Sequence, residues 1–63
     1  MASSWASKRS NVTLVNSVAA LWPSVLEASK KLDGKAKPTA AEKAATQDWE
    51  DAVRELASRI RNP

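Results

Sequence analysis

The side chains that most often carry out catalysis or hold metals are missing from this 63-residue sequence. It contains no His, Cys or Tyr and only one Gly. A catalytic acid, base or nucleophile would have to be an Asp, Glu, Lys or Ser, and one glycine cannot build a phosphate-binding loop. We therefore expect a chain that is not an enzyme and that uses no metal, no cofactor and no small-molecule substrate.

Three carboxylates share a spacing that could in principle bind a divalent cation. Asp48, Asp51 and Glu55 follow one another at intervals of three and four residues, so a helix would place them on one flank. Arg54 and Arg59 are close enough to balance their charge, and no loop is predicted to add convergent oxygen ligands. We interpret this flank as a solvated helix face.

Basic residues form the stronger electrostatic feature. The net charge is +3, with six basic and two acidic residues up to Ala41 and four basic and five acidic residues after it. The six basic residues that could contact phosphates are Lys8, Arg9, Lys30, Lys31, Lys35 and Lys37. A dimeric nucleic-acid-binding protein that uses this lysine-rich loop is our alternative functional hypothesis. Against it, lysines also stabilise helix C-termini and keep small proteins soluble, and no aromatic residue lies among them to stack on a base.

Apolar residues at steps of three and four predict a first helix over about residues 13–33. Ser10, Asn11 or Thr13 could cap its start, and Lys30 and Lys31 suit its last turn. We expect Gly34, just past the end, to adopt the left-handed conformation. Pro23 lies inside this helix, where it removes one hydrogen-bond donor. Because the apolar register continues through it, we favour one helix kinked at Pro23 over two short helices, which would give three helices in all.

A second helix is predicted over residues 39–61, after a loop at 34–38. Thr39 and Glu42 form a capping-box pattern directly after Pro38. Glu50 with Arg54 and Glu55 with Arg59 have the favourable i, i+4 spacing. The apolar residues of this helix form a single stripe that spans about 100°. They are Ala45, Trp49, Ala52, Val53, Leu56 and Ile60.

These elements predict an all-α chain in which two long antiparallel helices form a helical hairpin over residues 11–63. If the chain turns back at the loop, Trp22 lies at the level of Trp49, and Val15 at the level of Leu56. Residues 1–10 are Ser-rich, with Trp5 as the one large apolar residue beyond the initial Met, and are interpreted as a flexible N-terminal arm.

The first helix carries more apolar surface than one partner helix can cover, because its apolar arc spans about 160°. We expect an uncovered stripe of Leu14, Leu21, Val25 and Leu32. Three occupants are possible: the Trp5 arm, a second copy that completes a four-helix bundle, or a larger protein. The sequence thus favours a protein–protein interaction module, a regulator or inhibitor of a larger protein or a small subunit bound to it. Its predicted partner-binding residues are Trp5, Leu14, Val18, Leu21, Val25 and Leu32.

No apolar run approaches the roughly 20 residues that span a bilayer, so we expect no membrane span. The first 26 residues lack Asp and Glu and are rich in Ser, a composition also found in organelle-targeting presequences. Since the apolar register of the first helix continues past any plausible cleavage point, we expect a cytoplasmic protein, with organelle targeting as the minor alternative.

Overall fold

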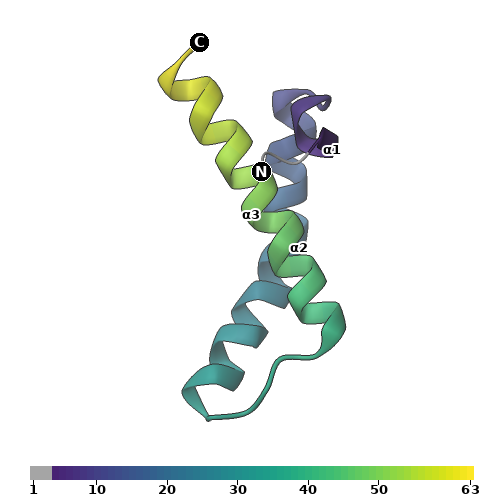
Figure 1. Cartoon of the computed structure of the whole chain (residues 1–63), viewed down its shortest axis with the longest axis vertical. Coiled ribbons are helices and arrows are strands. Elements are labelled where there is room, and N and C mark those ends of the chain that lie inside the picture. Colours follow the sequence, from purple (N-terminus) through teal and green to yellow (C-terminus); the bar gives the residue numbers. More distant parts are fainter. Residues whose placement is uncertain (1–3) are drawn as a thin grey trace.

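The computed structural model describes residues 4–63, which form three α-helices and no strand (Figure 1). The short helix α1 covers Ser4–Ser7, and the two long helices are α2, Asn11–Asp33, and α3, Ala40–Arg61. The long helices pack against each other and run in opposite directions on either side of the loop (Figure 1). The molecule measures 40 × 20 × 17 Å. The predicted all-helical class is confirmed, and both long helices begin and end within two residues of the predicted positions.

Side chains define where both long helices begin. The Ser10 hydroxyl accepts a hydrogen bond from the Thr13 backbone N–H at 3.2 Å, so Ser10 is the N-cap of α2. At the start of α3 the predicted capping box is confirmed: the Glu42 N–H donates to Thr39 Oγ1 at 3.1 Å, and the Thr39 N–H donates to Glu42 Oε1 at 2.8 Å. These bonds satisfy N–H groups that the helices leave without a carbonyl partner.

Helix α2 continues through Pro23 without interruption, which confirms one helix in place of two. Pro23 has no N–H, so the carbonyl of Ala19 loses its usual helical donor. Both residues are exposed, and water can therefore solvate that carbonyl. The third helix of the chain arises instead from residues 4–7.

The end of α2 differs from the expectation. The Ala36 N–H donates to the Lys31 carbonyl at 2.7 Å, and the Lys35 N–H donates to the Leu32 carbonyl at 3.0 Å, which is the Schellman pattern. In this pattern the left-handed residue is Lys35, with φ 60°, whereas Gly34 has φ −84° and ψ 7°. The prediction that Gly34 would be left-handed is wrong: Gly34 is the C-cap and still donates its N–H to the Lys30 carbonyl at 3.1 Å, so the left-handed position falls on Lys35.

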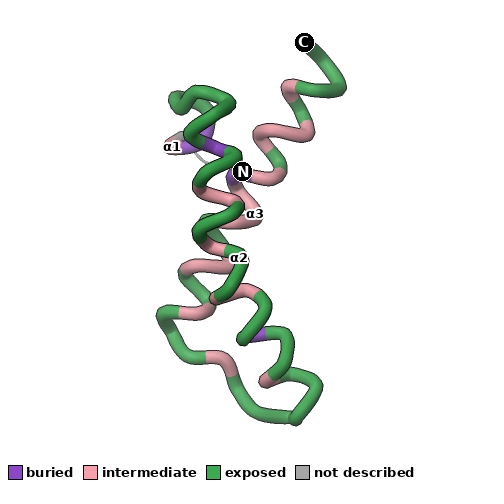
Figure 2. Tube along the Cα trace, turned by 180° about the vertical axis from the view of Figure 1, so that it is seen from behind, coloured by how far each residue is buried: buried purple, intermediate pink, exposed green. Residues whose placement is uncertain are grey.

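The core lies where all three helices meet. Ala6 of α1, Leu14 of α2 and Ala52 of α3 are almost completely buried, and Trp5, Val18 and Leu56 pack against them. Figure 2 shows buried positions beside α1 and a further buried segment of α2 nearer the loop. The remaining buried residue of α2 is Ala28. Residues 4–10 were expected to belong to a loose arm, but α1 instead covers one side of the long-helix pair; residues 1–3 lie outside the described part of the chain.

Arg59 of α3 forms hydrogen bonds that hold α1 against the long helices. Its guanidinium donates to the backbone carbonyls of Ala6 at 3.2 Å, Ser7 at 3.1 Å and Arg9 at 2.8 Å. It also donates to Asn11 Oδ1 at 2.8 Å and to Glu55 Oε2 at 2.9 Å. The Glu55–Arg59 pair was predicted from its spacing, as was Glu50–Arg54 at 3.2 Å. The hydrogen bonds from Arg59 to α1 and to residues 8–10, which link α1 to α2, were not predicted. The sequence does not indicate where these residues lie.

The first prediction concerns the Schellman turn. A non-glycine residue in the left-handed region costs about 1 kcal/mol, so Lys35→Gly should raise the free energy of unfolding by about 0.5 kcal/mol after the entropy of the more flexible unfolded chain is deducted. Thermal or urea unfolding measures this change.

Gly34→Ala is the matched control. A Cβ at Gly34 would lie 3.7 Å from the carbonyl oxygens of Lys30 and Lys31, an ordinary contact, and φ there is negative. This substitution should be neutral or stabilising. A loss of about 1 kcal/mol or more in Gly34→Ala, with no gain in Lys35→Gly, would place the left-handed residue at Gly34 after all.

The second prediction concerns acid stability. The Lys31 ammonium, 2.7 Å from Glu42 Oε1, lowers the pKa of Glu42 below its ordinary value of 4.5, and the Thr39 N–H acts in the same direction. The resulting stabilisation is complete above pH 4.5 and is lost as the pH falls through the lower pKa of the folded chain.

Glu42→Gln keeps a side-chain acceptor for the capping box but cannot ionise. Thermal unfolding as a function of pH should therefore show a smaller loss of stability below pH 4.5 in Glu42→Gln than in the unmodified chain. Glu27→Gln, which removes the exposed partner of Lys30, serves as the control and should retain the steep loss. Equal acid sensitivity of the unmodified chain and Glu42→Gln would contradict this account.

Candidate protein-interaction surface

One side of α2 presents an apolar stripe to solvent. It consists of Val12, Val15, Ala19, Trp22 and Leu26, which we call the α2 stripe. The exposed fractions of its large members are 71% for Val12, 53% for Val15, 46% for Trp22 and 38% for Leu26, and Ala19 is also exposed. Its spacing of three, four, three and four residues is the heptad spacing of a helix that packs against another helix. No charged side chain interrupts it.

This stripe is not the one that the sequence predicted. Of the predicted uncovered residues, Leu14 is fully buried, Leu21 and Val25 are half-buried, and Leu32 alone is largely exposed. The assignment of Leu14 to an uncovered stripe is wrong because Leu14 packs in the core with Ala6 of α1 and Ala52 of α3. The predicted inner residue Val15 is correspondingly more than half exposed.

The predicted partner-binding residues are therefore distributed over three places. Trp5, Leu14 and Val18 belong to the core or pack against it. Leu21 lies with Trp5 in a shallow hollow of about 350 Å³ beside α1, which Ser17, Ala20 and Asp48 also line. Val25 and Leu32 lie in a second hollow near the loop. They do not form a single surface, whereas the α2 stripe does.

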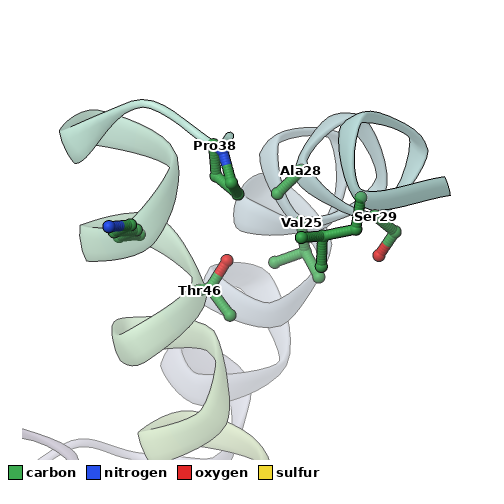
Figure 3. Close-up of a pocket in the computed structure, with 7 residues that line it drawn as sticks. Val25, Ala28, Ser29, Pro38 and Thr46 are labelled. Carbon is green, nitrogen blue, oxygen red and sulfur yellow. The ribbon is translucent and has the colours of Figure 1, made fainter. Parts of the chain in front are cut away.

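The second hollow separates the long helices at their loop ends (Figure 3). It has a volume of about 230 Å³. Val25 and Ala28 of α2 face Pro38 and Thr46 across it, as Figure 3 shows. The remaining lining residues are Ser29, Leu32 and Lys43. Its walls are largely apolar, but it is open to solvent and holds no group of converging polar atoms that would select a small ligand.

A tryptophan pair anchors the α2 stripe to α3. The ring centroids of Trp22 and Trp49 lie 5.7 Å apart with the ring planes tilted by 38°, which confirms the predicted contact between these residues. Trp22 remains nearly half exposed, whereas the Nε1 atom of Trp49 is buried and has no hydrogen-bond acceptor. Trp49 therefore holds the exposed indole of Trp22 in place, although the buried N–H group of Trp49 forms no hydrogen bond that stabilises the fold.

Lysine and arginine residues do not gather into one patch. Lys31 is bound to Glu42 at 2.7 Å, and Lys30 lies 3.6 Å from Glu27. Lys35 and Lys37 are exposed in the loop. Lys8 and Arg9 precede α2, and more than 20 residues of helix at 1.5 Å each separate them from the loop by about 30 Å. The six predicted phosphate-contacting residues therefore fall into two groups at opposite ends of α2.

Two of the three carboxylates on the flank of α3 also have protein partners. Asp51 accepts hydrogen bonds from Trp5 Nε1 at 3.4 Å and from Gln47 Nε2 at 3.2 Å, and Glu55 is bound to Arg59. Among residues 4–63, no group of three or more acidic side chains is arranged to hold a metal ion. In the same range no helix has the length and apolar character needed to cross a membrane.

Comparison of the chain with protein-family models, with curated proteins and with solved structures finds no significant match. The assignment of function therefore depends on the surface described above.

The third prediction concerns Trp49. Because its buried N–H has no acceptor, Trp49→Phe should change the free energy of unfolding by less than about 1 kcal/mol, since the lost ring volume is offset by removal of an unsatisfied donor. Trp49→Ala, which leaves a cavity beside Trp22, should cost about 3–5 kcal/mol. Urea unfolding of both variants tests this, and similar losses in the two would show that the N–H contributes to stability.

Proposed function

We propose that this chain is a small non-enzymatic helical module that acts by binding another protein. It serves as a regulator or inhibitor of a larger protein, or as a small subunit of an assembly. The observation that supports this proposal is the α2 stripe, an uncharged row of apolar side chains exposed along one side of a helix. Apolar surface of this kind gains free energy when a partner removes it from water.

The size of the stripe supports the proposal. Its exposed area is on the order of 400 Å², within the range of the largest apolar patch on a typical monomer, and such patches are often functional. An apolar helix face is also what the helix-in-groove mode of recognition requires, with anchors at intervals of three and four residues. Four large anchors lie along the stripe, with the small Ala19 between the second and the third.

Trp22 has the properties of a binding anchor. Tryptophan is enriched among the residues that contribute most to protein–protein affinity. Its ring is already held against Trp49, so less side-chain entropy is lost when a partner covers it. We therefore place Trp22 at the energetic centre of the interface.

The nucleic-acid-binding alternative receives less support. Lys31, in the centre of the predicted basic loop cluster, is engaged by Glu42, and Lys8 and Arg9 lie at the far end of α2. Lys35 and Lys37 alone would neutralise few phosphates, so their binding to nucleic acid would be weak and would depend on salt.

Site-specific photo-cross-linking tests the proposal. A photoreactive amino acid replaces Val15 in the stripe or, as the control, the exposed Ala20, which lies outside the stripe on the same helix. In cells that produce the chain, irradiation should yield a discrete protein adduct from position 15 and little from position 20. Introducing Leu26→Lys into the position-15 chain should remove the adduct, because a charge in the stripe cannot be buried without a partner.

Two results would contradict the proposal. One is an equal set of adducts from positions 15 and 20, which would indicate random collision. The other is a position-15 adduct that consists of nucleic acid and disappears when Lys35 and Lys37 are replaced by Glu, which would favour the alternative function.

A further inference from the structure

The α2 stripe matches itself in an antiparallel arrangement, and we infer that its occupant is the α2 stripe of a second copy of this chain. This inference rests on the proposed function, since it names the partner of the same surface. The result would be a symmetric dimer in which two α2 helices pack in the middle and the two α3 helices lie outside.

Side-chain sizes are complementary when positions whose numbers sum to 41 face each other. This register places the a position of each heptad in one helix opposite the d position of the partner, as antiparallel helix pairs require. Ala19 then faces the partner's Trp22, and Val15 faces the partner's Leu26. The twofold axis repeats both contacts, so a small or branched side chain lies opposite each large one along the seam. Ala19 leaves the space that the indole needs.

Charges at the ends of the seam are also complementary. The stripe spacing continues past Leu26 to Ser29 and then Asp33 in the last turn of α2. A carboxylate there is unfavourable for its own helix, whose C-terminal end is negative. In the same register Asp33 extends past the first residue of the partner's α2, Asn11, and lies beside the positive N-terminal end of that helix. In the described part of the chain Asp33 forms no ion pair, so its carboxylate is available to the partner helix.

The available area fits a dimer of ordinary size. A standard interface buries about 800 Å² on each partner, of which about 60% is apolar. The stripe alone supplies on the order of 400 Å² of exposed surface, most of the apolar part that such an interface needs. The described residues of the same chain do not cover it, because α1 is already packed on the other side of α2 against Leu14 and Ala52.

Solution mass as a function of concentration tests the inference on the full chain. Sedimentation equilibrium between about 1 µM and 1 mM, a range that spans weak and moderate dissociation constants, should show a shift from 6.8 kDa to twice that mass. Ala19→Glu should weaken association at least 100-fold, because it places a charge and added volume opposite the partner's Trp22. Ala20→Glu makes the same change at the neighbouring exposed position outside the stripe and should leave the mass unchanged.

Disulfide cross-linking tests the register, since the chain contains no cysteine of its own. Val15→Cys and Leu26→Cys chains, mixed and oxidised, should form the mixed dimer in preference to either homodimer. A parallel pair would instead join Val15→Cys chains to each other, which would overturn the antiparallel arrangement.

Circular dichroism of Ala19→Glu and Ala20→Glu establishes that both remain folded, as their exposed positions and the good helix propensity of Glu predict. An unmodified chain that stays at 6.8 kDa throughout the concentration range overturns the inference. If that monomer still gives a position-15 adduct with a larger protein, only the identity of the occupant is wrong. If it gives no protein adduct, the proposed function fails as well.

Discussion

Helix α2 has more apolar surface than one neighbouring helix can bury, and the arrangement of the chain follows from this constraint. At 100° per residue, its apolar side chains from Ala28 round to Val12 span roughly 200° of the helix. Helix α3 packs against the part of that arc that includes Val18, Val25 and Ala28. Helix α1 covers one edge by packing over Leu14. The opposite edge, from Val12 to Leu26, is left to solvent.

Helices α1 and α3 together therefore leave the Val12–Leu26 edge of α2 available for binding. A helix of four residues has no stability of its own, because the cost of nucleating it is not recovered over one turn. Helix α1 is held instead by the burial of Ala6 and by hydrogen bonds from Arg59. These bonds reach the carbonyls of Ala6 and Ser7 in α1 and of Arg9 in the link to α2. In this way Arg59 of α3 holds α1 against the core that it shares with both long helices.

Local sequence signals predicted much of this structure. The helix boundaries, the Thr39–Glu42 capping box, both i, i+4 ion pairs on α3 and the Trp22–Trp49 contact depend on residues close in sequence or on simple matching of two helices of similar length. The side of α2 that stays open was not predictable in the same way. It depends on α1, whose single turn has no periodicity, and on a guanidinium 50 residues away from Arg9. The left-handed residue was missed because a shift of one position at a helix end exchanges Gly34 for Lys35.

The central claim is that α1 covers the Leu14 edge of α2 and leaves the Val12–Val15 edge open. Methyl NMR with a soluble paramagnetic agent measures this directly, using the Ala19→Glu chain so that self-association does not cover the open edge. The account predicts weak relaxation of the Leu14 methyl groups and strong relaxation of those of Val12 and Val15. Strong relaxation at Leu14 together with protection of Val15 would contradict it, because α2 would then present the opposite edge to solvent.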